Sequence, residues 1–218
     1  MTRPWSILAG SLLLSVSTAP AVVSAAQSPG ESQVAALLAP SPDIGAIRAF
    51  GPGVLPVLAA LYGRSEAARR TSIAWTLYSL GWKSEEAKRA LMRDVHTDDT
   101  DLRLQVQWAL GRVSNDPDVV ETLVDNMRND GNPLFRDKAA CALANDQIHL
   151  NDDQRLRLYE RLVEALRDEK LQVRQIALKA LQIQTGQTKS FDPAAPAQAR
   201  EAALQEWTRW LDTYRSHL

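Results

Sequence analysis

A sequence pattern that recurs four times constrains the fold of this chain more strongly than any other feature. In the clearest copy, at residues 171–181, an arginine near the start is followed by an Ala-Leu pair near the end. Successive copies of the leucine lie 33, 33 and 38 residues apart, and the arginines keep the same spacing. The leucines are Leu77, Leu110, Leu143 and Leu181, and the arginines are Arg70, Arg103, Arg136 and Arg174. A fixed period of this length predicts a solenoid of stacked helix pairs.

A second apolar pattern precedes each arginine-bearing helix. Val54 is followed by apolar residues at i+3, i+4 and i+7, which is the spacing of one face of a helix. The same quartet returns ahead of the third and fourth copies, whereas the second copy begins with Lys88. We name the first helix of each pair the A helix and the arginine-bearing second helix the B helix. Four such pairs are predicted over residues 51–185.

The B helices resemble the second helix of HEAT repeats, whose usual run is Val-Arg, two variable residues, Ala-Ala, one variable residue and Ala-Leu-Gly. Val173-Arg174, Ala177 and Ala180-Leu181 match this run, and the second and third copies match it similarly. The first copy departs most, because Arg69 replaces the apolar residue and Thr76 replaces the alanine. The resemblance implies an all-α, right-handed α-solenoid of about four HEAT-like helix pairs with terminal caps. It implies an architecture and leaves the activity open.

The amino terminus is predicted to be a cleaved signal peptide over residues 1–26. Arg3 gives it a positive start, residues 5–16 are apolar, and Ser24-Ala25-Ala26 are small residues of the kind that a signal peptidase accepts. The alternative is an uncleaved membrane anchor, for which the apolar span is long enough. A proline and a Ser/Ala-rich second half make that helix a poor membrane span. We therefore expect an exported protein, periplasmic or extracellular, without stable membrane insertion after cleavage near residue 26 or 27.

Two further segments flank the repeats. Residues 27–50 are predicted to be an amino-terminal capping segment or half-repeat, and residues 186–218 a linker with a capping helix. The carboxyl end resembles a tail found after HEAT-like arrays in exported bacterial proteins, with a Thr-Gly-Gln turn, an aromatic-Asp-Pro run and a helix carrying two tryptophans. Here these tryptophans are Trp207 and Trp210. Since the last repeat of a solenoid has an exposed apolar flank, we predict that one of them covers it.

The chain offers little for catalysis or metal binding. The formal net charge of -1 argues against nucleic-acid partners, and the three histidines lie far apart. The acidic run at 94–101 lacks the glycine and terminal glutamate of a calcium loop, and a single cysteine, Cys141, excludes an internal disulfide. We therefore predict no catalytic residue, metal or cofactor. Bilin lyases share this repeat class, so a diverged lyase-like enzyme stays open as an alternative.

The repeated arginines are predicted to be structural. Three of them follow an aspartate in the preceding turn by five or six residues, which gives the sets Asp98, Asp130 and Asp168 and Arg103, Arg136 and Arg174. The resemblance to HEAT arrays implies that such residues form a ladder of ion pairs between adjacent repeats. A phosphate-binding role is the alternative, but the net-acidic chain supplies no supporting basic field.

A partner-binding surface is predicted on the outer side of the B helices. Trp75 and Trp108 share a repeat position with Cys141 and Lys179, about 200° around the helix from the core stripe. Tyr78 and Leu104 lie on the same outer stripe, as does Trp82 if its helix continues past Gly81. We predict partner binding by Trp75, Tyr78, Leu104 and Trp108.

The predicted function is that of a non-catalytic scaffold or adaptor that binds a protein or peptide. The alternatives are a small-ligand binder that uses the aromatic patch and the lyase-like enzyme. A purely structural interpretation also stands, in which residues 33–50 or neighbouring helices cover the two tryptophans.

Overall fold

The computed structural model describes residues 29–218, and all regular elements in this part of the chain are helices. The predicted signal peptide at 1–26 lies outside the described residues. The helices are α1 (Glu31–Leu37), α2 (Ile44–Ala49), the short 3-10 helix η1 (Gly51–Val54), α3 (Leu55–Arg64), α4 (Ala67–Leu80), α5 (Glu85–Met92), α6 (Thr100–Val113), α7 (Pro117–Asn129), α8 (Pro133–Asn145), α9 (Asp152–Ala165), α10 (Leu171–Thr185) and α11 (Ala197–Arg215).

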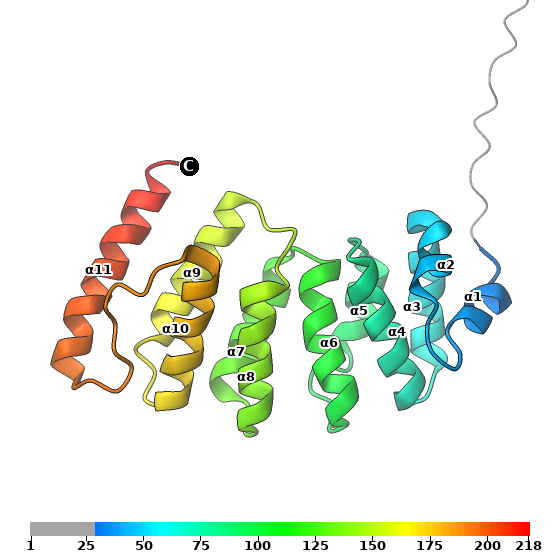
Figure 1. Ribbon diagram of the computed structural model, residues 1–218, viewed down its shortest axis with the longest axis horizontal. Helices are drawn as coiled ribbons and strands as arrows, with labels where there is room; N and C mark the ends of the chain where they lie inside the picture. The colour runs from blue at the N-terminus through cyan, green and yellow to red at the C-terminus, as the bar shows by residue number, and fades with distance from the viewer. Residues whose placement is uncertain (1–28) are drawn as a thin grey trace, which may run out of the picture.

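The helices form the predicted solenoid of four pairs. The A helices are α3, α5, α7 and α9, and the B helices are α4, α6, α8 and α10. Each B helix packs on its own A helix, and successive B helices pack on one another from α4 to α10. Figure 1 shows the pairs following one another along the long axis of the molecule, with α1 and α2 at one end and α11 at the other. The predicted all-α solenoid is therefore confirmed.

The recurrent leucines form the spine of the core. Leu77, Leu110, Leu143 and Leu181 are fully buried, and so are Ile73, Val106, Ala139 and Ala177 one turn earlier on each B helix. Burying one leucine side chain contributes roughly 1.5–3 kcal/mol. A position that is apolar in all four repeats therefore stabilises each pair in the same way.

Lys88 of α5 accounts for the departure of the second A helix from the apolar pattern. Its Nζ lies 2.5 Å from the Asp116 carboxylate and 3.3 Å from that of Asp118, at the start of α7. The hydrogen bond to Asp116 holds the pKa of Lys88 above its ordinary value, against the opposing effect of burial. The lysine thus joins two successive A helices through charge, where the other copies use an apolar residue.

Helix α4 ends at Leu80, so it does not continue past Gly81 to Trp82. Gly81 has a φ of 67°, a left-handed conformation that costs glycine nothing and costs other residues about 1 kcal/mol or more. Trp82 therefore leaves the helix, and its ring lies 5.5 Å below the guanidinium of Arg48.

The terminal helices lie against the ends of the array. At the amino end, Arg48 of α2 donates to the carbonyl of Ser79 at 2.6 Å, and Arg69 of α4 donates to the carbonyl of Ala35 at 2.9 Å. At the carboxyl end, α11 packs on α9. Helices α1 and α2 lie within the flanking segment 27–50, and α11 lies within the flanking segment 186–218.

Candidate functional site

Two of the repeated arginines form ion pairs between successive repeats. Arg103 is buried and pairs with Asp130, which lies in the turn between α7 and α8. Its guanidinium carbon also lies 4.2 Å from the centroid of the Phe135 ring. Arg70 makes two contacts of 2.9 Å with Asp94, in the turn after α5. In both cases the B-helix arginine reaches the A–B turn of the next pair, so the pair ties two repeats together.

The other two arginines hold backbone carbonyls. Arg136 donates to the carbonyl of Asp130 at 2.7 Å and to the side chain of Gln172 on α10 at 2.9 Å. Arg174 is buried and donates to the carbonyls of Asp168 and Glu169 at 2.8 and 2.9 Å, and to a carbonyl of the carboxyl-terminal linker at 2.8 Å. These two arginines therefore hold the turns in place, and within residues 29–218 neither pairs with an aspartate carboxylate.

The structure corrects the set of aspartates. Asp98 is exposed and makes no side-chain hydrogen bond or ion pair within residues 29–218. Asp94 takes its place in the ladder, and Asp99 caps α6 by accepting from the Leu102 amide at 2.9 Å. The Asp168 carboxylate does not pair with Arg174 but lies 3.2 Å from Nε of Arg128 on α7. The reason is geometric, because the conformation of each A–B turn decides which carboxylate faces the seam, by which we mean the contact between one helix pair and the next.

Three of the four predicted partner-binding residues lie together. Trp75, Tyr78 and Trp108 line one open hollow of about 300 Å³ between α4, α6 and α8. The Trp75 and Tyr78 rings are stacked, with centroids 5.3 Å apart and planes inclined by 21°. Trp75 is 43% exposed and Trp108 is half-buried. The amino-terminal helices therefore leave Trp75 open, contrary to the alternative in which residues 33–50 cover it.

Leu104 lies apart from this hollow. It is half-buried on α6, one turn before Trp108, and it does not contribute to the lining. Leu104 lies on the same side of α6 as Trp108, as the helical periodicity predicts. The hollow, however, is lined by the carboxyl-terminal halves of α4 and α6, and Leu104 lies nearer the amino end of α6. We therefore correct its grouping with the three aromatic residues.

An ion pair that the sequence did not predict lies in the lining of the hollow. The guanidinium carbon of Arg112 lies 4.2 Å from the centroid of the Tyr78 ring, and its Nε lies 3.0 Å from the carboxylate of Asp146. Burial raises the pKa of Asp146, while Arg112 and Tyr78 act to lower it. Arg112 follows Trp108 by four residues, one helical turn, and this spacing could have placed it beside Trp108 from the sequence alone. Asp146 follows the end of α8, and nothing local in the sequence points to it.

A second hollow lies beside the first, between α8 and α10. Cys141 lines both, and the second is a narrower apolar recess of about 40 Å³ formed mainly by alanines and isoleucines. The lining residues of this second hollow are Asp137, Ala140, Cys141, Ala144, Ile176, Lys179, Ala180 and Ile183. Burial, reinforced by Asp137, raises the pKa of the Cys141 thiol. We refer to the two hollows together as the B-face groove.

Exposed apolar residues concentrate on the B helices. Six large apolar side chains are exposed within residues 29–218, namely Trp75, Leu134, Ile148, Leu171, Ile183 and Leu218. Four of the six lie on α4, α8 and α10, and none lies on an A helix. Single exposed apolar residues are ordinary on a protein surface. Two of these four, Trp75 and Ile183, line the hollows between the B helices.

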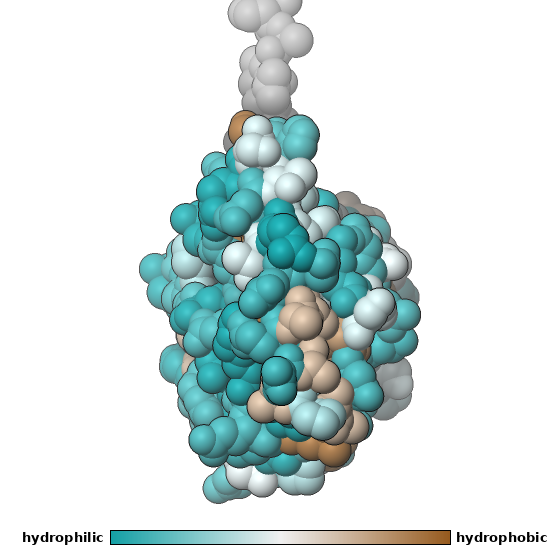
Figure 2. Space-filling model, turned by 90° about the vertical axis from the view of Figure 1, so that its left-hand side faces the viewer, coloured by the Kyte–Doolittle hydropathy of each residue, from teal (hydrophilic) through white to brown (hydrophobic). Residues whose placement is uncertain are grey.

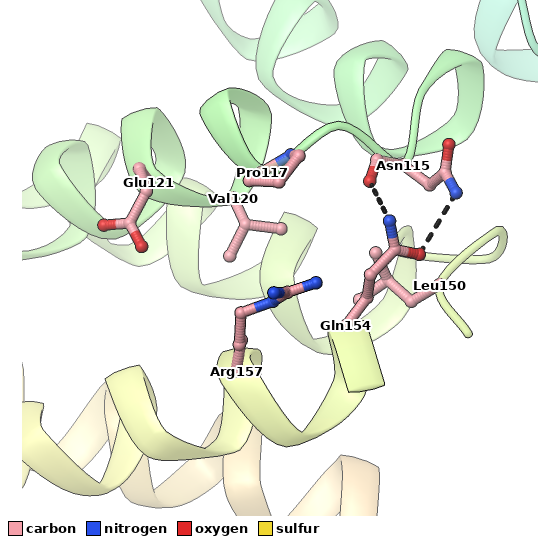
Figure 3. Close-up of a pocket in the computed structure, with 7 residues that line it drawn as sticks. All are labelled: Asn115, Pro117, Val120, Glu121, Leu150, Gln154 and Arg157. Carbon is pink, nitrogen blue, oxygen red and sulfur yellow. Dashed lines mark hydrogen bonds between the residues drawn. The ribbon is translucent and has the colours of Figure 1, made fainter. Parts of the chain in front are cut away.

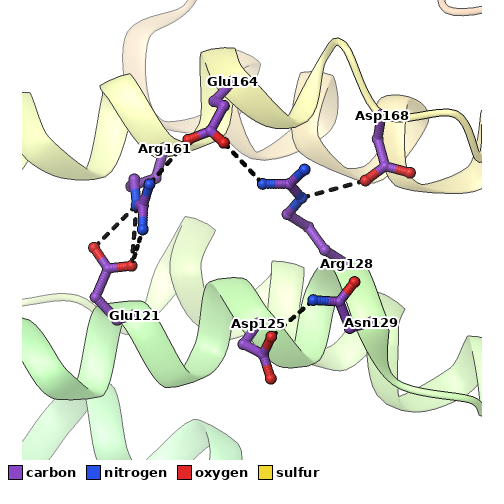
Figure 4. A network of polar contacts seen from close by, with 7 residues as sticks. All are labelled: Glu121, Asp125, Arg128, Asn129, Arg161, Glu164 and Asp168. Atoms are coloured by element: carbon purple, nitrogen blue, oxygen red, sulfur yellow. Dashed lines mark hydrogen bonds and ion pairs between the residues drawn. The ribbon is translucent and has the colours of Figure 1, made fainter.

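The A helices present a charged surface instead. Arg161 of α9 contacts Glu121 of α7 with Nε–O distances of 3.0 Å. Arg128 of α7 reaches Glu164 at 3.0 Å and Asp168 at 3.2 Å, and Figure 4 shows these side chains joining the two helices. Exposed ion pairs contribute little each, so this network mainly keeps the A-helix layer polar.

A small hollow on this side is a packing gap. Gln154 donates to the carbonyl of Asn115 at 2.8 Å and accepts from its side-chain amide at 3.1 Å, which joins the amino ends of α7 and α9. Figure 3 shows these two residues beside Val120 and Arg157. The cavity measures about 20 Å³, roughly the space that one water molecule occupies.

The carboxyl end of the solenoid is closed by aromatic packing. Trp207 of α11 is fully buried, and Trp210 lies edge-on to it with ring centroids 5.6 Å apart. Trp210 also lies 5.5 Å from the Tyr159 ring of α9. Figure 2 looks at this end and shows a mainly hydrophilic surface crossed by one apolar strip. Trp207 is therefore the tryptophan that covers the flank of the last pair.

Residues 29–218 contain neither a cluster of metal ligands nor a membrane-spanning helix. No group of three or more His, Cys, Asp or Glu side chains is placed so that it could hold a metal ion. In the same part of the chain, no helix is both long and apolar enough to span a membrane.

Comparison with known proteins identifies the repeats. Residues 54–144 match the HEAT repeats family. These residues are HEAT repeats. The chain is also similar to a solved structure, that of the complex of CpcE and CpcF of phycocyanin lyase from Nostoc sp. PCC7120. The identity is 20%, the match covers 71% of this chain and 98% of that one, and the TM-score is 0.43. No curated protein matches the chain.

The HEAT repeats contain the aromatic part of the groove. The matched residues run from the end of η1 to α8, so they include both ladder ion pairs and the residues Trp75, Tyr78, Trp108 and Arg112. Helices α9 and α10 lie beyond the matched range and continue the same packing, because α10 packs on α8 as α8 packs on α6.

Proposed function

We propose that this HEAT-repeat protein is a non-catalytic scaffold or adaptor that binds a protein or peptide partner in the B-face groove. The observation that carries the proposal is the contrast between the two layers. Trp75, Tyr78 and Trp108 lie around one open hollow on the B side, while ion pairs cover the A side between α7 and α9. Aromatic residues in such hollows supply much of the binding energy at protein interfaces.

The polar groups in the hollow favour binding over chemistry. Arg112 and Asp146 neutralise each other, and the Cys141 thiol is held protonated by the effect of burial on its pKa. A protonated thiol beside a satisfied ion pair is not an activated nucleophile. A small aromatic ligand is the second candidate, because a hollow of about 300 Å³ lined by three rings is near the lower limit of ligand sites.

The proposal is tested by removing the two tryptophans together. In the Trp75→Ala/Trp108→Ala variant, capture of partner proteins from the native envelope fraction should fall at least about tenfold. The melting temperature should fall only modestly, because Trp75 is 43% exposed and Trp108 is only half-buried. Trp82→Ala is the matched control, since Trp82 lies outside the groove lining and its loss should leave capture unchanged.

Two results would reject the partner-binding proposal. If the double variant unfolds well below the wild-type temperature, the rings belong to the folded core. If capture is unchanged, the groove is not the binding site. A ligand absorbance that copurifies with the protein and disappears in the double variant would instead support the small-ligand candidate.

We further propose that the protein acts outside the cytoplasm. The support is the sequence of residues 1–26, with its positive start, apolar run and Ser24-Ala25-Ala26. Amino-terminal sequencing of the chain from a periplasmic or extracellular fraction should give a start at Ala26 or Gln27. A full-length chain recovered with the membranes would contradict this.

A further inference from the structure

The B-face groove crosses all four B helices. Its wide end lies between α4, α6 and α8 and its narrow end between α8 and α10, and Cys141 belongs to both. A ligand that fills it must therefore run across the helices. Adjacent packed helices lie roughly 8–10 Å apart, so the three steps from α4 to α10 cover roughly 24–30 Å.

This length corresponds to a short extended peptide. An extended chain rises about 3.3 Å per residue, so roughly seven to nine residues span the distance from Trp75 to Lys179. From Trp108 to Lys179 there are two steps, or roughly five to six residues. Hollows of about 300 and 40 Å³ are the size of side chains, which fits an extended segment better than the surface of a folded domain.

The groove also has an uneven distribution of charge. Arg112 is paired with Asp146 at 3.0 Å, and Asp137 is paired with Lys138 at 2.9 Å. Lys179, in the lining of the narrow end, is exposed and forms no ion pair within residues 29–218. One cation without a protein partner therefore lies at the α10 end, and the aromatic rings lie at the α4 end.

The wide end can also satisfy a peptide backbone. Arg112 uses Nε for Asp146, and its two terminal nitrogens make no hydrogen bond within the described residues. Asn145 also lines the hollow; its amide nitrogen donates to the Cys141 carbonyl at 3.0 Å, which leaves its side-chain oxygen able to accept. A bound segment needs both donors and acceptors, because a buried unpaired backbone group is costly.

We propose that the ligand of the B-face groove is an extended peptide with an aromatic or large aliphatic residue at one end and an acidic residue at the other. The apolar residue packs on Trp75 and Trp108, and the carboxylate pairs with Lys179, five to nine residues away along the peptide. This inference rests on the proposed function and specifies the chemistry of its partner.

The test uses defined peptides and the purified full chain. Twelve-residue peptides are blocked at both ends and carry a fluorophore, with Leu or Trp at position 2 and Ala, Gly and Ser elsewhere. A single Asp, Lys or Asn is placed in turn at positions 7 to 11, and binding is measured by fluorescence anisotropy. In one of these positions, the Asp peptide should bind at least about fivefold more tightly than the Lys peptide.

Charge reversal at Lys179 makes the test specific. In Lys179→Glu the preferred peptide should change from Asp to Lys at the same position. Arg89→Glu is the matched control, because Arg89 is an exposed cation on the A helix α5 and should leave the preference unchanged. In Trp75→Ala/Trp108→Ala, binding of the Asp peptide should fall about thirtyfold or more. Melting temperatures of all variants establish that each is folded.

The outcomes separate this inference from the proposed function. Peptides that bind without charge preference, or with a preference that Lys179→Glu leaves unchanged, overturn the inference. Asp-peptide binding that survives loss of both tryptophans overturns it as well. If no peptide binds but envelope partners are still lost in the tryptophan variant, the inference is wrong and the proposed function stands, with a folded partner surface as the ligand.

Discussion

The Arg103–Asp130 pair provides the sharpest test of how the repeats are held together. The Arg103 side chain is 10% exposed and the Asp130 side chain 6% exposed, so Arg103→Ala leaves a carboxylate buried without its partner. Breaking such a pair by removing one member costs about 3–5 kcal/mol. Within residues 29–218, Nε of Arg103 has no hydrogen-bond partner, so the pair is not fully satisfied and we expect a value near the lower limit, about 3 kcal/mol.

The change should be visible in a simple melt. For a chain of this size, 1 kcal/mol shifts the melting temperature by roughly 2–4 °C, so Arg103→Ala should lower it by roughly 6–12 °C. Urea unfolding followed by circular dichroism at the helix band gives the free energy directly. Arg209→Ala is the matched control, because its pair with Glu206 is 62% and 55% exposed and should contribute less than about 1 kcal/mol.

A double-mutant cycle isolates the pair itself. Asp130→Ala also removes the hydrogen bond from the Asn132 amide to the carboxylate, at 2.8 Å, and the cycle cancels that loss. The Arg103→Ala/Asp130→Ala variant should be at least about 1.5 kcal/mol more stable than the sum of the two single losses predicts. A coupling below about 0.5 kcal/mol, or an Arg103→Ala variant as stable as Arg209→Ala, would refute the argument that this ladder pair holds the repeats together.

Three further predictions follow from individual contacts. Gly111→Ala should lower the free energy of unfolding in urea by about 1–3 kcal/mol, because a methyl there would lie 2.5 Å from Gln147 Nε2 and 2.8 Å from the Asp146 carbonyl oxygen. Gly63→Ala is the control, because a methyl there would meet only the flexible end of Arg93. Equal stabilities of the two variants would contradict the close contact at Gly111. Truncation after Gly186 should expose the flank covered by Trp207 and produce aggregates in size-exclusion chromatography, and a monomeric truncated chain with an unchanged melt would show that α11 is no cap. Burial and the hydrogen bond to Asp94 raise the pKa of Tyr62 above its ordinary value of 10.0, so the folded chain keeps a proton that the unfolded chain loses above pH 10. Stability should therefore fall as the pH rises from 10 to 12, and Tyr62→Phe should reduce that slope in urea melts, whereas an unchanged slope would contradict the assignment.

The sequence alone determined the features that depend on local periodicity. Helix positions repeat every 3.6 residues, so the apolar spacing located the four pairs and the buried leucines, Leu77 among them. The same geometry placed Trp75 and Trp108 on the outer side of the B helices, where the structure has them around one hollow. Both results concern the side of a helix on which a residue lies, either within one helix or at the same position of successive repeats.

Only the tertiary structure decided the features that depend on turns and on neighbouring repeats. The seam contacts of Arg136 and the replacement of Asp98 by Asp94 follow from turn conformations that no period specifies. Three features depend on how one pair rotates against the next: the packing of Asp146 against Arg112, the separation of Leu104 from the hollow, and the place of Cys141 in both hollows. A helix wheel gives the side of a helix on which a residue lies, but the residues that meet it across a seam are set by the packing of the whole array.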